Sequence, residues 1–315
     1  MTVTEILQSR KTTGFSIEVL PPLKGSSIDK VFESIDSLRE FNPLYINITS
    51  RHSEPVYQTS SDGKYKKLFV RKRPGTVAVA AAIQHRYGIP TVPHIICSGF
   101  TPSETEYVLI DLNFLGIHDL LLLRGDNDKE MLVDPKECHR HATDLIQQVN
   151  DFNEGKFLDG TTTDPLKNKF SFGVAGYPEK HEEAPNMESD LRYLKQKVDA
   201  GAGYIITQLF FDNQKYFDFV DKCRAMGITV PIIPGLKPIK KLSQLSVLPK
   251  TFGVNMPEPL VRELEKCKSD NDAKSVGIEW LTHQCKELIA KGVPNLHFYT
   301  LAASDSVAEV ARRVY

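Results

Sequence analysis

Short apolar segments alternate along this chain with longer segments whose apolar residues recur at helical spacing. The alternation repeats about eight times, as is typical of parallel strands joined by crossover helices. The predicted strands cover residues 15–19, 45–49, 91–96, 119–123, 170–175, 204–208, 230–234 and 296–299. Eight such units predict an α/β fold, a single closed (β/α)8 TIM barrel.

The spacing and capping residues also place helices and bound the domain. Ser27 is a suitable N-cap for a helix with Val31 and Leu38 on its apolar face. An extra helix is expected around residues 257–267, in the C-terminal third, before a last helix near 280–290. Because no proline-rich or low-complexity linker divides the chain, one domain covering residues 1–315 is predicted.

Charge and cysteine content narrow the function classes. The chain has 315 residues, with 39 Lys and Arg against 40 Asp and Glu, so general binding to nucleic acid or acidic membranes is not expected. Five cysteines without CxxC spacing argue against a disulfide framework and indicate a reducing compartment. There is no secretory leader pattern and no apolar stretch near the roughly 20 residues of a membrane span. A soluble, cytoplasmic protein is therefore expected.

Polar side chains gather at the carboxyl ends of the predicted strands, where a barrel assembles its active site. Arg124, Gly125 and Asp126 follow the apolar run 119–123, and such a pair of charges suits a phosphate and a reacting centre. Taken alone, these three residues favour a surface ion pair in a loop. The other strand-end residues are Glu18, Thr49, His94, Tyr177, His181, Gln208 and Tyr299.

Glu18 lies within an otherwise apolar strand. Alternation places it on one face with Ser16, and Phe15, Ile17 and Val19 on the other. Desolvation in a barrel mouth is expected to raise the pKa of such a carboxyl group, which suits a general acid. The alternative is a structural ion pair with a basic residue.

Several other sequence patterns are weaker evidence for a functional site. His94 alone is more often a buried, hydrogen-bonded histidine than a ligand contact. Cys138, His139 and His141 are too close in sequence to converge on one ion, so no metal site is predicted. The chain has neither GxGxxG after its first strand nor GxxxxGK[ST], which disfavours Rossmann and P-loop binding. One basic cluster is interpreted as a solvated loop, with steering of an anionic substrate as the alternative; it contains Lys64, Lys66, Lys67, Arg71, Lys72 and Arg73.

Taken together, seven groups of segments resemble the methylenetetrahydrofolate reductase family, flavoproteins that make methyltetrahydrofolate. The resemblance spans almost the whole chain in the family's order. The segments are Phe15-Ser16-Ile17-Glu18 with Pro21-Pro22, Val92-Pro93-His94, Leu123-Arg124-Gly125-Asp126, residues 175–181, residues 195–201 with 207–212, Ile232-Ile233-Pro234-Gly235, and His297-Phe298-Tyr299-Thr300-Leu301.

The resemblance implies an FAD-binding barrel that works in two half-reactions in one-carbon metabolism and methionine biosynthesis. NADH or NADPH delivers hydride to the flavin and leaves, and methylenetetrahydrofolate then receives it. The sequence does not decide between NADH and NADPH. Family members are often homo-oligomers, although no interface patch is identified here.

The resemblance also assigns residues by position. Glu18 matches the general acid that promotes opening of the folate ring, and Asp126 matches the carboxylate that stabilises the resulting cation. The implied cofactor contacts are Thr49, His94, Arg124, Gly125, Asp126, His141, Ala142, Ala175, Tyr177, His181, Asp190 and Lys197. The implied substrate contacts are Glu18, Asp126, Gln208, Gln244, Leu248 and Tyr299.

Three departures from the family pattern leave alternatives open. His141 stands where the family usually has tyrosine, and Ala302-Ala303 stand where Asn-Arg is common. The chain ends at Tyr315 without the additional regulatory domain of eukaryotic members, so no inhibition by S-adenosylmethionine is expected. The alternatives are a flavin-free folate or pterin enzyme on the same barrel, and a non-catalytic folate-binding subunit.

Overall fold

The computed structural model describes residues 1–59, 63–125, 132–300 and 303–315. Its barrel strands are β1 Gly14–Val19, β2 Ile46–Ile48, β5 Thr91–Ile96, β6 Asp119–Leu123, β7 Ser171–Gly176, β8 Tyr204–Leu209, β9 Ile232–Leu236 and β10 Asn295–Tyr299. Within the described residues these eight strands close in the order β1-β10-β9-β8-β7-β6-β5-β2. The predicted (β/α)8 barrel is confirmed.

One strand lies later than its apolar run predicts. Residues 230–234 were expected, but β9 runs from Ile232 to Leu236. Pro234 and Gly235 suggest the end of a strand, yet Gly235 and Leu236 still pair with His297 and Phe298 of β10. The Gly235 N–H also donates to the Thr207 hydroxyl at 2.9 Å. A side chain on residue 235 would meet Tyr299, so the strand needs glycine at this point.

The helices follow the predicted alternation. They are α1 Val3–Ser9, α2 Asp29–Asp36, α3 Thr76–Tyr87, α4 Pro102–Phe114, α5 Ala142–Asn153, α6 Met187–Asp199, α7 Asn213–Ala225, α8 Gln244–Phe252, α9 Glu258–Glu265, α10 Asp270–Ala290 and α11 Ser304–Val314. The predicted extra helix is α9, and α8 is a second one that precedes it. Within the described ranges, no helix is both long enough and apolar enough to cross a membrane.

The contacts within the chain define two compact units. The first contains Met1–Val19, Phe32–Ile46 and Gly173–Tyr315. In it β1 and β10 pair in parallel, with Ser16 opposite His297 and Glu18 opposite Tyr299. The apolar side chains of α8, α9 and α10 add a cluster around Leu248 and Leu260, both almost fully buried. This unit carries the larger part of the barrel strands.

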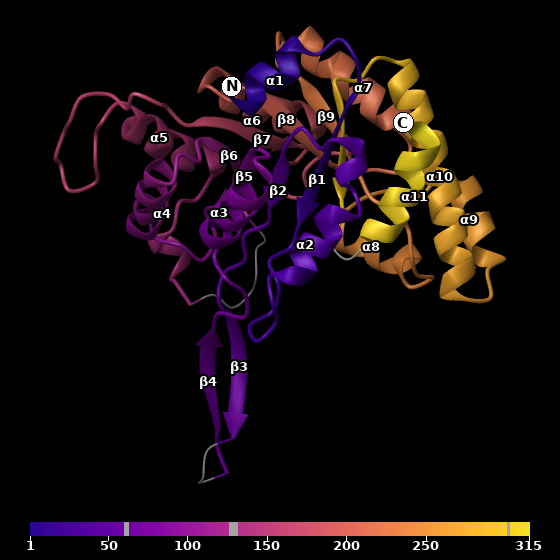
Figure 1. The fold of residues 1–315 in the computed structure, drawn as a ribbon, viewed down its shortest axis with the longest axis horizontal. Helices are drawn as coiled ribbons and strands as arrows, with labels where there is room; N and C mark the ends of the chain where they lie inside the picture. The colour runs from indigo at the N-terminus through magenta and orange to yellow at the C-terminus, as the bar shows by residue number, and fades with distance from the viewer. Residues whose placement is uncertain (60–62, 126–131, 301–302) are drawn as a thin grey trace. The chain divides into compact units, whose positions relative to one another are not determined.

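The second unit contains Leu20–Val31 and Asn47–Phe172. Its strands β5 and β6 pair in parallel, with His94 opposite Leu121. It also holds an antiparallel hairpin, β3 Glu54–Thr59 and β4 Tyr65–Val70, which extends away from α3 and α4 of the same unit (Figure 1).

The hairpin corrects the interpretation of the basic cluster as a loop. Lys66 and Lys67 are exposed, as expected, but they lie on β4. Both faces of the outer half of the hairpin are in solvent. Its sequence therefore lacks the polar and apolar alternation by which a half-buried strand is recognised.

Candidate functional site

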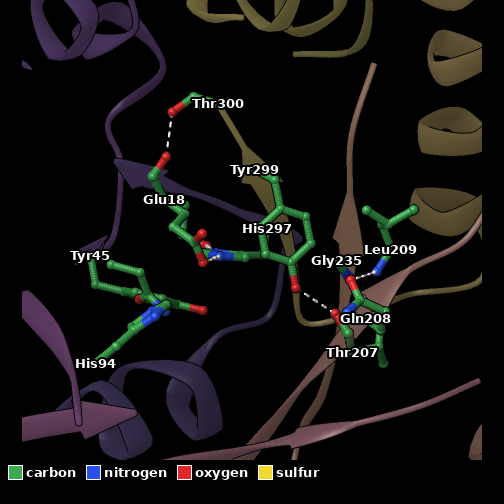
Figure 2. Close-up of polar contacts among 12 residues, drawn as sticks. Glu18, Tyr45, His94, Thr207, Gln208, Leu209, Gly235, His297, Tyr299 and Thr300 are labelled. Carbon is green, nitrogen blue, oxygen red and sulfur yellow. Dashed lines mark hydrogen bonds and ion pairs between the residues drawn. The ribbon is translucent and has the colours of Figure 1, made fainter. Parts of the chain in front are cut away.

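Glu18 stands near the carboxyl end of β1, and its side chain is buried, with 6% of the residue exposed. Its Oε2 lies 3.8 Å from Nε2 of His297, a fully buried residue of the paired strand β10. Figure 2 shows the carboxyl group directed toward this imidazole. Among the described residues, His297 Nε2 has no hydrogen-bond partner. The main-chain carbonyl of Glu18 accepts from the Thr300 hydroxyl, which fixes the strand end.

Buried polar side chains contact the His297 imidazole at its other nitrogen, Nδ1. Its Nδ1 lies 2.9 Å from the Ser16 hydroxyl, and the Ser16 oxygen also accepts from the Asn295 amide at 2.6 Å. The Tyr45 ring stacks on the imidazole, with centroids 6.1 Å apart and 13° between the planes. Burial raises the pKa of the Tyr45 hydroxyl, and a hydrogen bond with Ser16 opposes the rise. Because these groups are buried and packed, the imidazole is held in one orientation toward Glu18.

Tyr299 forms the next part of the site, on the same face of β10 as His297. Its hydroxyl donates to the Thr207 carbonyl at 2.7 Å, and its ring lies edge-on to the His297 ring with centroids 5.3 Å apart. Burial is the main cause that raises the pKa of Tyr299, and the charge of Glu18 adds to it. Tyr299 therefore stays protonated, and its ring is the part that remains for contact with a ligand.

Gln208 lies next to Thr207 near the end of β8 and is half-buried. Its Oε1 accepts from the Leu209 main-chain N–H at 2.9 Å. This contact leaves the amide nitrogen as the group that can donate to a ligand. Figure 2 shows Gln208 beside Thr207 and Gly235.

The loop after β7 is ordered by its own side chains. Tyr177 and His181 pack edge to face at 4.6 Å, and the His181 N–H donates to Asp190 Oδ2 at 2.9 Å. Lys180, which has a left-handed backbone with φ 81°, donates to the carbonyls of His181 at 2.9 Å and Ala184 at 2.7 Å. The predicted contacts Tyr177, His181 and Asp190 are thus brought together.

Lys197 reaches from α6 to the end of β7. Its Nζ donates to the Ala175 carbonyl at 2.9 Å, so these two predicted contacts also meet. Burial lowers the pKa of Lys197 to about 8, and the charge of Asp190 opposes this shift. A cation held at a strand end in this way can bind a phosphate or a ribose hydroxyl.

Gln244 is the first residue of α8, and Leu248 lies on the same helix. Gln244 Oε1 accepts from the main-chain N–H groups of Lys240 at 2.6 Å and Lys241 at 3.0 Å, so it shapes the turn before the helix. Leu248 is 3% exposed and belongs to the apolar cluster of the first unit. In this structure both side chains are engaged within the protein.

Two residues near Glu18 were not singled out from the sequence. Lys237 directly follows β9; burial lowers its pKa, Glu18 raises it and Lys240 lowers it further. His297 was noted only as part of a longer segment. A barrel closes by pairing its first and last strands. The alternation that places Ser16 and Glu18 on one face, and His297 and Tyr299 on one face of the paired strand, could therefore have indicated that His297 lies near Glu18.

In the second unit, His94 lies on β5 and Thr49 directly follows β2. The Asn47 amide nitrogen lies 3.1 Å from His94 Nε2. An amide N–H can only donate, so Nε2 accepts and a neutral His94 carries its proton on Nδ1. Asn47 Oδ1 is buried without a hydrogen-bond partner in the described part of the chain.

Arg124 and Gly125 directly follow β6. The Arg124 carbonyl accepts from the Ser98 N–H at 2.9 Å and from its hydroxyl at 2.7 Å. Gly125 has φ 87°, and a Cβ there would lie 2.7 Å from the Ser98 hydroxyl oxygen. Glycine is thus required on both conformational and steric grounds. Asp126 lies outside the described residues, as does Ala302.

His141 and Ala142 stand at the start of α5. His141 is the exposed N-cap residue. The Asp144 carboxylate accepts from the main-chain N–H groups of Arg140 at 3.1 Å and His141 at 3.0 Å, which satisfies this helix end. The helix start is therefore stable without a tyrosine at position 141.

Solved structures with the same fold include two that cover nearly the whole chain. A protein from Clostridium thermocellum, described as binding two copies of 5-methyl-5,6,7,8-tetrahydrofolic acid, has a TM-score of 0.63 at 14% identity and covers 99% of this chain and 98% of its own. A 2,3-dimethylmalate lyase has a TM-score of 0.53 at 10% identity and covers 98% of this chain and 82% of its own. At such identities the likeness concerns the fold alone.

Sequence relatives have named activities. A probable methylenetetrahydrofolate reductase (NADPH) of Caenorhabditis elegans is 30% identical over 310 residues, which are 98% of this chain and 43% of that protein. A probable methylenetetrahydrofolate reductase (NADH) of Oryza sativa is 32% identical over 97% of this chain and 49% of its own length. The chain thus spans about half the length of these relatives.

A bacterial relative is matched over most of its length. The 5,10-methylenetetrahydrofolate reductase of Escherichia coli K12 is 30% identical over 291 residues, 92% of this chain and 86% of that protein. The family model described as methylenetetrahydrofolate reductase matches residues 2–315. This chain therefore belongs to the methylenetetrahydrofolate reductase family.

Proposed function

We propose that this chain is an FAD-dependent enzyme that reduces 5,10-methylenetetrahydrofolate to 5-methyltetrahydrofolate with NADH or NADPH. The family match over residues 2–315 and the names of the relatives support the reaction class. The observation that carries the proposal within the structure is the buried Glu18 carboxyl group beside His297. A reaction that opens the folate ring needs a proton donor, and we assign that role to the Glu18 carboxyl group.

The residues present fit FAD. In the first unit, Lys197 would supply positive charge to its diphosphate. In the second unit, Arg124 is assigned to the cofactor by resemblance, and Asn47 Oδ1 is a buried acceptor without a hydrogen-bond partner among the described residues. His181 and Tyr177 form an ordered wall in the first unit, and His94 lies on β5 in the second. Bound FAD would take hydride from the nicotinamide and pass it to the folate in two separate half-reactions.

Glu18 is proposed as the general acid. In the tautomer with a proton on Nε2, His297 can donate to the ionised Glu18 carboxylate. In the other tautomer it can accept a hydrogen bond from the neutral carboxyl group. The gap of 3.8 Å closes to a hydrogen bond with a small rotation of the side chain. His297 can thus form a hydrogen bond with Glu18 in both protonation states of the carboxyl group.

Three further residues are proposed to complete the substrate side. Asp126 is assigned, by resemblance alone, to stabilise the cation formed when the folate ring opens. Gln208 offers its amide nitrogen to the pterin, and Tyr299 offers its ring while its hydroxyl bonds Thr207. We further propose that residues 1–315 act as one catalytic domain.

An anaerobic visible spectrum tests the proposal. The purified protein, reconstituted with FAD if necessary, should show flavin absorption that bleaches on adding NADH or NADPH. Adding methylenetetrahydrofolate should restore the absorption. A colourless protein that cannot be reconstituted, or a bleached flavin that the folate does not reoxidise, would contradict the proposed function.

A further inference from the structure

Lys237 directly follows β9, at the carboxyl end of the strand. It is half-buried and lies between Leu236 and Pro238, which are both buried. Removing a cation from water is costly unless a group of opposite charge is near. The half-reactions proposed for this chain assign no role to this lysine, so its place at the site calls for one.

The register of the strands sets Lys237 at the level of Glu18. β1 pairs with β10 so that Glu18 lies opposite Tyr299. β10 pairs with β9 so that Phe298 lies opposite Leu236. Because paired strands rise by nearly the same distance per residue, the next residues, Tyr299 and Lys237, also lie level with each other. Glu18 and Lys237 thus stand at the same height on two strands that flank β10.

Gly235 indicates the face to which the lysine side chain is directed. A Cβ on residue 235 would lie 2.7 Å from the Tyr299 hydroxyl oxygen, so this position faces the site. Since successive side chains of a strand alternate, residue 237 is directed to the same face. Burial lowers the pKa of Lys237, the charge of Glu18 raises it, and Lys240 lowers it further. The effect of Glu18 agrees with a lysine side chain that lies near its carboxyl group.

Two helices fix the segment that carries Lys237. Ile239 is 1% exposed, and a Cβ on Gly277 of α10 would lie 2.2 Å from its main-chain oxygen. Glycine therefore allows α10 to pack closely on this segment. The Lys240 N–H donates to Gln244 Oε1 at 2.6 Å, which fixes the turn before α8. The backbone at Lys237 is thus held in one position relative to β9.

Other titratable side chains of the first unit also lie near this lysine and the proposed acid. Lys240 Nζ binds Asp305 Oδ1 of α11 at 3.1 Å, so its charge is balanced. Burial is the main cause that raises the pKa of Tyr299, so its hydroxyl stays neutral. His297 Nε2 lies 3.8 Å from Glu18 Oε2. Neither the neutral tyrosine nor the balanced Lys240 replaces the charge of the lysine after β9.

We propose that Lys237 is a positioning residue for the acid Glu18 and balances the carboxylate that remains after the proton has left. This inference rests on the proposed function. When the folate ring opens, the Glu18 O–H bond breaks and its proton goes to a ring nitrogen. The C–N bond at that nitrogen breaks and leaves its electron pair there, so a carboxylate, a neutral amine and a folate cation result. A nearby ammonium group favours the carboxylate, so Lys237 makes Glu18 a stronger acid.

The protonation state of Glu18 can be measured without turnover. Infrared titration of the purified protein follows the absorption of the neutral carboxyl group, which is assigned to Glu18 by its absence in Glu18→Gln. Lys237→Met and Lys237→Gln both remove the charge, whereas Lys237→Arg retains it. Lys241→Met is the matched control, because Lys241 is an exposed lysine of the same segment.

Lys237→Met should move the titration midpoint of Glu18 to higher pH by about one pH unit, and Lys237→Gln should do the same. Lys237→Arg and Lys241→Met should keep the wild-type midpoint. In Lys237→Met the loss of the folate half-reaction at high pH should shift upward by the same amount. An unchanged Glu18 midpoint in both neutral variants, or an equal shift in Lys241→Met, would overturn the proposal.

The titration also separates this proposal from the proposed function. A shifted Glu18 midpoint in a protein whose reduced flavin is not reoxidised by the folate would support the pairing of Lys237 with Glu18. The same result would contradict only the proposed reaction. A wild-type protein that reduces the folate while Lys237→Met leaves the Glu18 midpoint unchanged would contradict only the role of Lys237.

Discussion

Nε2 of His297 lies 3.8 Å from Oε2 of Glu18, and both groups are buried. The two residues belong to the first and last strands of the barrel, which pair directly. Among the residues that the structure describes, His297 Nε2 has no hydrogen-bond partner, and leaving such a buried group unsatisfied costs about 1–3 kcal/mol. Its position beside the proposed acid gives a functional reason for that cost.

His297→Asn should slow the folate half-reaction about tenfold to a hundredfold, because Glu18 loses the group that orients it. Reduction of the flavin by NADH should stay near the wild-type rate. The decisive readout is the pH profile of the folate half-reaction, which should shift relative to wild type. A lower melting temperature with an unchanged pH profile would show that His297 is only structural.

Ser16→Ala removes the hydroxyl that bonds His297 Nδ1 but leaves the imidazole in place. We expect a smaller effect in the same direction, because only the orientation of the ring is loosened. Rapid-reaction measurements of both half-reactions would show it. An effect on flavin reduction equal to that on the folate step would contradict the assigned arrangement.

FAD affinity should depend on pH through Lys197. Burial lowers its pKa to about 8, so the ammonium group is charged below that value and neutral above it. If it binds a cofactor phosphate, the dissociation constant of FAD should rise about tenfold per pH unit above about pH 8. Lys197→Arg should remain charged and flatten this dependence. A wild-type affinity that stays constant to pH 10 would refute the role.

The same shift predicts a stability effect of opposite sense. The unfolded chain retains the lysine proton up to about pH 10.5, the ordinary pKa of lysine, whereas the folded chain loses it near pH 8. Between these values the unfolded state binds more protons, so the contribution of Lys197 to the free energy of unfolding becomes more favourable as pH rises. Urea unfolding of wild type and Lys197→Met at pH 7 and 10 would reveal the difference. Identical pH trends would exclude it.

Gly125→Ala should destabilise the end of β6 by more than the positive φ of residue 125 alone would cost. Gly253 provides the control, since it has φ 64° and open space around it, whereas Gly125 faces the Ser98 hydroxyl at 2.7 Å. The free energy of unfolding should fall by about 1–3 kcal/mol more in Gly125→Ala than in Gly253→Ala. Equal losses would mean that the Ser98 contact is relieved without cost.

The sequence predicted the barrel well because apolar runs and helical spacing are set by burial, which is the same in every βα unit. It predicted Glu18 because a carboxyl group in an apolar strand is conspicuous. It did not single out His297, because the contact between this residue and Ser16 joins positions 281 residues apart in the chain. The β3–β4 hairpin was also missed, because the outer half of its strands is exposed on both faces and carries no periodic signal.

The central claim is tested most directly by following the flavin of wild type and Glu18→Gln through each half-reaction under anaerobic conditions. In both proteins NADH or NADPH should bleach the flavin at similar rates. Methylenetetrahydrofolate should then reoxidise the wild-type flavin rapidly and the Glu18→Gln flavin at least about a hundredfold more slowly. Equal loss of both half-reactions, or full folate activity in Glu18→Gln, would contradict the account.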